Sequence, residues 1–294
     1  MAISERPMSG KTSILTFDIE DWFHILDNPE TATPVNWQSL PSRFESGLQR
    51  ILDFLDARSL KATFFILGWV AERYTDAVAD IARRGHEIAC HSHLHQLVFT
   101  QTEAEFEGDL LRALTAIEKA TGVVPKAYRA PGFSITESCT WAFDVLARNG
   151  IETDCSIFPA ARAHGGMQSF PMRTPCRIST GSGNVLKCFP LNFLKFAGRK
   201  LVFSGGGYFR LLPHPVLATA FRHSDYVMTY FHPRDFDPDQ PAVPGLGRVR
   251  HFKSYVGIKG ALGKLDRIAQ QVSFKTLRDA DAAIDWGATK MVLL

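Results

Sequence analysis

The sequence predicts an α/β fold in which helices connect the strands of a parallel sheet. Short apolar runs alternate with segments of helical periodicity along the first half of the chain. The run KATFFIL (61–67) is apolar at most of its positions, as in a strand that is buried on both faces of a parallel sheet. No hinge-like linker divides the 294 residues. This alternation is typical of an open doubly wound sheet or of a closed barrel.

The predicted elements follow one another in a regular order up to residue 157. Strands are expected at 13–18, 61–67, 86–91, 125–131 and 151–157. Helices are expected between them, at 43–58, 76–84, 102–120 and from Ser134 to about Gly150. The third of these helices begins with a capping box, because Thr102 is followed three residues later by Glu105.

The second half of the chain carries fewer regular signals. Residues 159–184 are rich in Gly, Ser, Pro and Arg, so we expect a long loop over one end of the sheet. Further strands are predicted at 201–210 and 226–231, and a helical segment at 262–285. The ending KMVLL is predicted to form a last strand that returns beside the first one.

The composition limits the function classes. The formal net charge of +3 gives no reason to expect nucleic-acid binding. No apolar run reaches the roughly 18–20 residues of a membrane span, and the first residues, MAISERPMSGKTS, lack the apolar region of a secretory signal. The five cysteines are widely spaced and form no CxxC pair, which favours reduced thiols. We therefore expect a cytoplasmic protein.

Ionisable residues follow five of the predicted strands. They are Asp18, Glu20 and Asp21 at the first strand, His91 and His95 after the third, Arg129 at the fourth, Asp154 in the fifth and His232 after a late strand. In parallel α/β folds, catalytic groups gather at the carboxyl ends of the strands. We therefore expect these side chains to meet in one site.

The sequence HSHLH places His91 and His95 four residues apart. On one turn of helix such residues point the same way and can share a metal ion. The spacing alone is a weak signal, and a pair of surface histidines is the alternative. Together with a carboxylate from another strand, two imidazoles are typical of a catalytic zinc site with open positions. His93 is expected to point elsewhere.

The segment FDIEDWFH carries three carboxylates within four positions. Like charges raise each other's pKa, and a divalent cation together with Arg129 would compensate them. Along a strand, Asp18 and Glu20 share a face whereas Asp21 points away. We therefore assign Asp18 as the general base and Glu20 as the first choice for a carboxylate ligand. Asp21 remains the alternative ligand, because the chain often turns at a strand end.

These residues, in this order, resemble the NodB-type polysaccharide deacetylases of carbohydrate esterase family 4. The resemblance is carried by TFDIED from Thr16, HSHLH from His91, RAPGF from Arg129, DCSIFP from Asp154 and YFHP around His232. The first motif of the family is usually TFDDG, so the usual adjacent Asp pair is missing here. The first motif is similar to that of intracellular-type peptidoglycan deacetylases, and the segments 204–213 and 231–238 resemble the branch linked to exopolysaccharide export loci.

The resemblance implies a distorted (β/α)7-type barrel in a single domain over residues 1–294, with 233–294 as an extension that packs on the barrel and closes it. It implies a divalent metal held by His91, His95 and a carboxylate, with zinc as the first choice and cobalt or nickel as alternatives. Asp18 would be the general base, paired with Arg129. His232 would be the general acid, oriented or tuned by Asp154, and the backbone N–H of Gly132 would serve the oxyanion.

The implied reaction removes the N-acetyl group of an amino sugar in a glycan or glycan precursor and releases acetate. The sugar substrate is expected to be lipid-linked, nucleotide-linked or polymeric, and the oligomeric state stays open. Two other classes remain: a metal-dependent hydrolase of a cyclic imide, ureide or formamide, and a non-catalytic sugar-binding barrel. Near the C-terminus, Arg248, Arg250 and Lys253 are either solvated charges or the lining of a groove for an anionic glycan or diphosphate carrier.

Overall fold

The computed structural model describes residues 10–26, 28–160, 165–196 and 199–294. The strands in this part of the chain are β1 (Thr12–Ile14), β2 (Thr16–Ile19), β3 (Thr63–Ile66), β4 (Glu87–Cys90), β5 (Ala127–Tyr128), β6 (Thr153–Asp154), β7 (Cys176–Ser179), β8 (Val185–Cys188), β9 (Leu194–Phe196), β10 (Arg199–Leu201), β11 (Tyr226–Met228), β12 (Phe274–Lys275) and β13 (Met291–Leu293).

The helices of the same part lie between and after these strands. The α-helices are α1 (Pro34–Gln38), α2 (Phe44–Ala57), α3 (Gly68–Arg73), α4 (Thr75–Arg83), α5 (Glu103–Thr121), α6 (Trp141–Arg148), α7 (Gly206–Leu211), α8 (His214–His223), α9 (Arg248–Tyr255), α10 (Ile258–Ala269) and α11 (Leu277–Ala282). The 3-10 turns are η1 (Pro29–Thr31), η2 (Val98–Thr100), η3 (Pro131–Phe133), η4 (Pro233–Phe236) and η5 (Trp286–Ala288).

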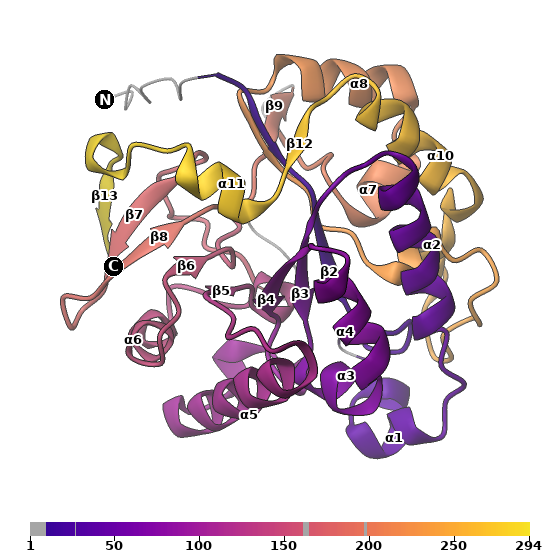
Figure 1. Cartoon of the computed structure of the whole chain (residues 1–294), viewed down its shortest axis with the longest axis horizontal. Coiled ribbons are helices and arrows are strands. Elements are labelled where there is room, and N and C mark those ends of the chain that lie inside the picture. The colour runs from indigo at the N-terminus through magenta and orange to yellow at the C-terminus, as the bar shows by residue number, and fades with distance from the viewer. Residues whose placement is uncertain (1–9, 27, 161–164, 197–198) are drawn as a thin grey trace.

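The strands form a curled sheet (Figure 1). From β2 to β6 each strand pairs in parallel with the next, and helices α2 to α6 lie in the connections. The same sheet continues through β8, β7 and β13. On the other side, β1 runs directly into β2 and pairs with β11, while Phe17 of β2 bridges to Phe231. The sheet therefore curls into a distorted (β/α)7-type barrel in one domain, as predicted.

Apolar contacts between neighbouring strands and helices hold this barrel together. Phe17 of β2 and Phe64 of β3 are fully buried and stack with their ring centroids 5.3 Å apart. Burial of each such side chain contributes about 1.5–3 kcal/mol. The predicted capping box of α5 is present between Thr102 and Glu105, and the helix ends at Gly122, whose φ of 73° suits a residue without a Cβ.

Half of the segment predicted as a strand at 201–210 is helical, because its last five residues belong to α7. Its first residue is the last of β10. Helix α7 begins at Gly206, the second of three consecutive glycines. Glycines offer no side chains to pack on a pleated surface. Phe209 of α7 is instead buried against Phe231, with 4.9 Å between ring centroids. Gly205 forms a β-bridge with Tyr230, and only a glycine fits there because a Cβ would lie 2.1 Å from the carbonyl oxygen of Tyr230.

Two further predictions need correction between residues 134 and 184. The helix expected from Ser134 begins only at Trp141, because Glu137 accepts hydrogen bonds from Ser169 and does not cap a helix. The expected loop at 159–184 contains β7, which pairs with β8 in an antiparallel ladder.

The C-terminal residues add strands at two places. KMVLL contains β13, as predicted, but β13 pairs with β7 and not with the first strand. The return to the start of the chain is made earlier, by β12, which pairs with β1. After β12, α11 and η5 carry the chain away from β1 to the edge of β7 (Figure 1). None of the helices that the structure describes is long and apolar enough to span a bilayer.

Candidate metal centre and active site

The predicted site residues lie at the carboxyl ends of the barrel strands. Glu20 follows β2, His91 follows β4, Arg129 follows β5, and His232 follows the bridge between Phe17 and Phe231. Parallel strands place these ends on the same side of the barrel. The fold therefore brings together residues that lie far apart in the sequence.

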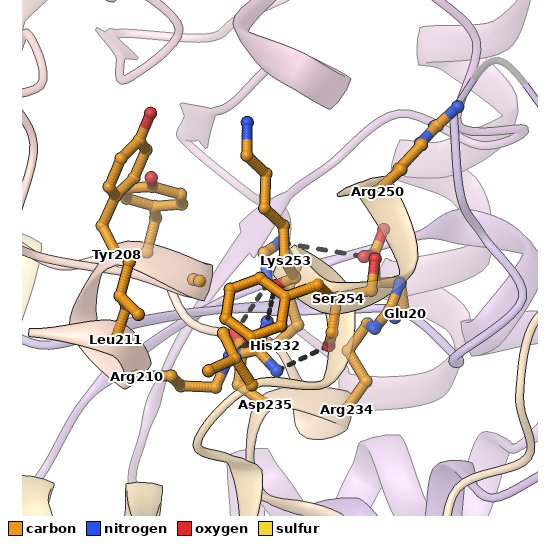
Figure 2. Close-up of a pocket in the computed structure, with 15 residues that line it drawn as sticks. Glu20, Tyr208, Arg210, Leu211, His232, Arg234, Asp235, Arg250, Lys253 and Ser254 are labelled. Atoms are coloured by element: carbon orange, nitrogen blue, oxygen red, sulfur yellow. Dashed lines mark hydrogen bonds and ion pairs between the residues drawn. The ribbon is translucent and has the colours of Figure 1, made fainter. Parts of the chain in front are cut away.

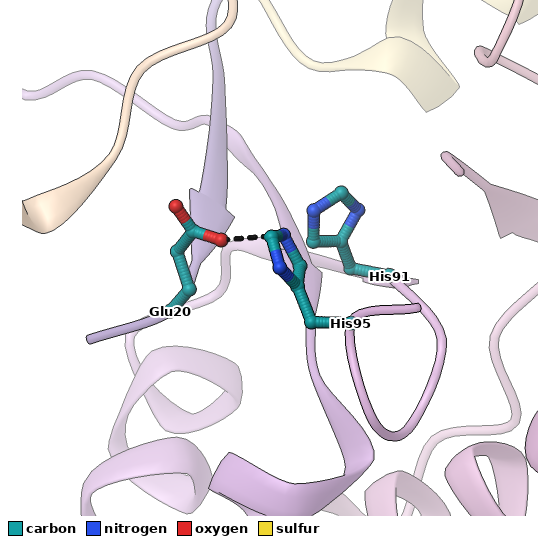
Figure 3. Close-up of side chains that lie close together, drawn as sticks. All are labelled: Glu20, His91 and His95. Carbon is teal, nitrogen blue, oxygen red and sulfur yellow. Dashed lines mark ion pairs between the residues drawn. The ribbon is translucent and has the colours of Figure 1, made fainter. Parts of the chain in front are cut away.

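Glu20, His91 and His95 form a compact cluster of possible metal ligands (Figure 3). One oxygen of Glu20 and one nitrogen of each imidazole all lie within 4.8 Å of one another, and all three residues are buried. The shortest of these contacts is 2.7 Å, between Nε2 of His95 and Oε2 of Glu20. Two nitrogens and one oxygen at this spacing are typical of the protein ligands of a catalytic zinc ion.

His91 is held in the form that a metal ligand needs. Its Nδ1 lies 2.7 Å from the carbonyl oxygen of Arg129. A carbonyl only accepts, so Nδ1 carries the proton and Nε2 keeps its lone pair. Burial lowers the pKa of His91 to about 4, which keeps the ring neutral at pH 7.

The two histidines are not on a helix, contrary to the geometry assumed for HSHLH. Ser92 and His95 have φ values of 68° and 53°, so the segment is a loop with two left-handed residues. The carboxylate of Asp109 on α5 holds this loop by accepting hydrogen bonds from the backbone N–H groups of His93 and Leu94, at 2.7 and 2.9 Å. A tight loop, not a helical turn, thus brings the imidazoles together, and the His93 side chain packs away from them against Gly68.

Glu20 lies with the imidazoles, whereas Asp21 does not. The carboxylate of Asp21 accepts hydrogen bonds from the hydroxyl of Ser42 and the backbone N–H of Arg43, just before α2. Burial alone would raise the pKa of Glu20, but the imidazoles of His95 and His232 outweigh it and lower the pKa. Glu20 therefore supplies an ionised carboxylate at the cluster, and Asp21 is committed to the start of a helix.

Asp18 and Arg129 form a buried ion pair beside the cluster. Nη1 of Arg129 lies 2.5 Å from Oδ1 of Asp18 and 2.9 Å from the hydroxyl of Thr16. The guanidinium also lies over the ring of Phe65, 4.0 Å from its centroid, and Arg129 is fully buried. Arg129 thus fixes the direction of one carboxylate oxygen and leaves the other facing His232, at 3.8 Å from Nε2.

His232 is oriented by Asp235, which the sequence reasoning missed. Nδ1 of His232 lies 2.9 Å from Oδ2 of Asp235, and Nε2 points towards Asp18 and Glu20. Burial alone would lower the pKa of His232, but the negative charge of Glu20 and the contact with Asp235 raise it to about 9. The signal was present in FHPRD, because a carboxylate three residues after a histidine can close a capping box with it.

Asp154 does not take the place that was predicted for it beside His232. It is fully buried, and its Oδ2 accepts a hydrogen bond from the backbone N–H of Ser156, two residues further along the chain. Burial raises the pKa of Asp154 to about 7. The pairing of Asp154 with His232 is therefore wrong, because the turn that follows His232 supplies a nearer carboxylate.

Gly132 lies in the turn that follows Arg129. Its φ of 62° is in the left-handed region, which a glycine adopts without strain. The proposed role of its N–H towards an oxyanion stays a prediction.

Two family models cover most of the chain. One, a domain of unknown function (DUF3473), matches residues 155–282, and the polysaccharide deacetylase model matches residues 5–152, half of the chain. The chain belongs to the polysaccharide deacetylase family. The boundary between the two matches falls at β6, inside the barrel of this deacetylase-family protein. Its cluster and its Asp18–Arg129 pair come from the first part of the chain, and His232 and Asp235 come from the part matched as DUF3473.

Curated relatives of this deacetylase-family protein carry matching names. A peptidoglycan-N-acetylglucosamine deacetylase from Bacillus cereus is 28% identical over 138 residues, and a peptidoglycan deacetylase from Helicobacter pylori is 27% identical over 113 residues. These matches cover 41% and 38% of this chain and 50% and 38% of the relatives. The chain thus matches half or less of the length of these relatives.

Solved structures share the fold. A Mycobacterium smegmatis protein assigned to the polysaccharide deacetylases has a TM-score of 0.59 at 23% identity, covering 94% of this chain and 98% of that one. Puue allantoinase has a TM-score of 0.59 at 15% identity, with coverage of 92% and 89%. A CE4 family pseudoenzyme from Bacillus anthracis has a TM-score of 0.50 at 14% identity, with coverage of 97% and 68%. At these identities the likeness shows the fold alone.

Proposed function

We propose that this protein is a metal-dependent hydrolase that removes the N-acetyl group from an amino sugar and releases acetate and a free amine. The observation that carries the proposal is the juxtaposition of the Glu20–His91–His95 cluster with an oriented carboxylate, Asp18, and an oriented imidazole, His232. Membership of the polysaccharide deacetylase family supports it. The resemblance of 204–213 and 231–238 to the exopolysaccharide-locus branch favours a precursor of an envelope polysaccharide as the source of the sugar.

The donor atoms of the cluster fit a divalent cation. Glu20, His91 and His95 would hold it, and His91 already has the tautomer that leaves Nε2 available. Mixed imidazole and carboxylate ligands suit zinc, and cobalt or nickel can occupy the same kind of site. When bound, such a cation polarises the acetyl carbonyl and lowers the pKa of a water molecule.

The residues around the cluster divide the proton transfers between them. Asp18 accepts a proton from the attacking water, with its carboxylate held in place by Arg129. The water oxygen forms a bond to the acetyl carbon, and the electron pair of the carbonyl π bond moves onto oxygen to give an oxyanion, to which the N–H of Gly132 donates. The carbon–nitrogen bond of the acetamide breaks as this oxyanion returns its electron pair to form the carboxyl group. His232, protonated and oriented by Asp235, donates its proton to the departing amine.

Acetate release from N-acetylglucosamine oligomers by the zinc-loaded protein tests this proposal. Asp18→Asn and His232→Ala should each lower kcat by about 10²–10⁴-fold, the usual contribution of a general base or acid. Asp239→Asn is the matched control, because Asp239 is an exposed carboxylate that pairs with Arg50. Activity on allantoin-like ureides in place of acetamido sugars, or wild-type turnover in Asp18→Asn, would contradict the proposal.

A further inference from the structure

A pocket of about 310 Å³ opens beside the Glu20–His91–His95 cluster (Figure 2). Glu20 and His232 form part of its lining, so it is continuous with the proposed catalytic centre. Most of the remaining lining comes from α7, η4 and α9, which all lie in the segment matched as DUF3473. In the view of Figure 2, Tyr208 and Leu211 border one side, and Arg234 and Arg250 border the other.

The charged side chains of this lining are mainly cationic. They are Arg210, Arg234, Arg250 and Lys253 on the positive side and Glu20 and Asp235 on the negative side. Both carboxylates have other roles. Glu20 belongs to the metal cluster, and Asp235 contacts His232 as well as Arg210, at 3.2 Å from its Nε.

Arg210 is also engaged elsewhere, since its guanidinium donates hydrogen bonds to the backbone carbonyls of Lys253 and Ser254. These bonds hold α9 against α7. Arg250 lies on the same helix and donates to the carbonyl of Leu26. Contacts with backbone carbonyls therefore fix the position of α9 and of the Arg250 guanidinium beside the pocket.

Arg234 and Lys253 remain available for a ligand. Nη2 of Arg234 is buried and has no hydrogen-bond partner among the described residues. A buried guanidinium N–H without an acceptor is costly, and an anion in the pocket would satisfy it. The exposed Lys253 comes from α9, a different wall from the η4 turn that carries Arg234.

We propose that this pocket binds a phosphoryl group attached to the acetylated amino sugar, so that the substrate is a sugar phosphate or diphosphate and not a neutral polymer. The inference rests on the proposed function. A single carboxylate is satisfied by one bidentate arginine, whereas a phosphoryl group has more charge and more oxygens to offer to cations on separate walls. Because the pocket shares Glu20 and His232 with the catalytic centre, the phosphoryl group lies next to the sugar whose acetamide reacts.

Binding of inorganic pyrophosphate to the zinc-loaded protein, followed by titration calorimetry, tests the pocket without any turnover. Lys253→Gln and Arg234→Gln should each raise the dissociation constant about tenfold or more, as expected for the loss of a charge-assisted hydrogen bond. Lys259→Gln, an exposed lysine on α10 outside the pocket, is the matched control and should bind like the wild type. Unchanged affinity in both pocket variants would overturn the proposal. Binding that is lost in His91→Ala but kept in Lys253→Gln would also overturn it, because the pyrophosphate would then sit on the metal.

Turnover then distinguishes the source of the phosphoryl group. We expect kcat/KM to be higher for nucleotide-diphosphate-linked or lipid-diphosphate-linked N-acetylglucosamine than for neutral oligomers. The diphosphate substrate with the higher kcat/KM identifies the carrier as a nucleotide or a lipid. In Lys253→Gln the ratio of phosphorylated to neutral kcat/KM should fall about tenfold. Equal kcat/KM on all three substrates would overturn the phosphoryl assignment. If no substrate releases acetate, the proposed function fails, and the pyrophosphate titration still decides the pocket.

Discussion

Replacing Asp235 by Asn should shift the pH dependence of catalysis, because Asp235 is a main support of the protonated form of His232. The pKa of His232 is raised from 6.5 to about 9, which corresponds to roughly 3 kcal/mol in favour of the protonated ring. Glu20 and Asp235 both contribute to it. A bound divalent cation would offset the charge of Glu20, which leaves Asp235 as the carboxylate in direct contact with the ring, at 2.9 Å.

The sign of the effect follows from the role of a general acid. His232 must be protonated to donate to the leaving amine, so kcat falls as the pH rises through its pKa. Asn keeps an oxygen that can accept from the backbone N–H of His232, but it carries no charge. Loss of one adjacent carboxylate lowers such a pKa by about 1–2 pH units. The alkaline limb of the pH–kcat profile should therefore move to lower pH by that amount.

The assay measures acetate release by the zinc-loaded wild type and by Asp235→Asn between about pH 5.5 and pH 10. This pH range covers both limbs of the bell-shaped profile that a general acid and a general base produce. Asp237→Asn is the matched control, because Asp237 is an equally buried carboxylate two residues away that pairs with Arg43. An alkaline limb at the wild-type position in Asp235→Asn, or an equal shift in Asp237→Asn, would refute the reasoning.

The same substitution has a predicted effect on stability in the metal-free protein. A histidine whose pKa is raised on folding contributes stability that is fully present below its unfolded pKa, near 6.5, and is lost as the pH rises through about 9. The difference in Tm between the wild type and Asp235→Asn should therefore be largest below pH 6.5 and should shrink towards pH 9. A difference that stays constant over this range would contradict the raised pKa.

Three further experiments test other parts of the protein. Glu20→Gln should weaken zinc binding, measured by competition with a chelating dye. Asp21→Asn should leave zinc binding unchanged, because Asp21 contacts the start of α2. An equal loss of zinc affinity in both variants would contradict the assignment of Glu20 as the ligand. Burial raises the pKa of Asp154 to about 7, so its neutral form favours the folded state and this stability is lost as the pH rises from about 4 to 7. The free energy of unfolding of Asp154→Asn should therefore rise relative to the wild type between about pH 5 and pH 8, by up to a few kcal/mol in urea titrations, and a pH-independent difference would count against the shift. A Cβ on Gly68 would lie 2.4 Å from the ring of His93 in the HSHLH loop, so Gly68→Ala should cost about 1–3 kcal/mol in urea unfolding and weaken zinc binding. Gly108→Ala, where a Cβ meets nothing, should instead stabilise its helix by about 1 kcal/mol.

Local patterns in the sequence were sufficient to predict the alternation of strands and helices. They also predicted that the site lies at the carboxyl ends of the strands. Strand periodicity put Asp18 and Glu20 on one face and Asp21 on the other, and the structure has this arrangement. The capping box at Thr102 was equally clear. These features depend on residues within a few positions of each other, so the chain encodes them locally.

The contacts between distant segments were decided only by the tertiary structure. HSHLH forms a loop and not a helical turn, because the carboxylate of Asp109 on α5 accepts hydrogen bonds from two of its backbone N–H groups. The carboxylate beside His232 is Asp235 and not Asp154. Arg210 of α7, Arg234 of η4 and Lys253 of α9 line one pocket although they come from three separate elements. Such contacts depend on how strands pair and how loops pack across the barrel, and the period of a single segment carries no information about either.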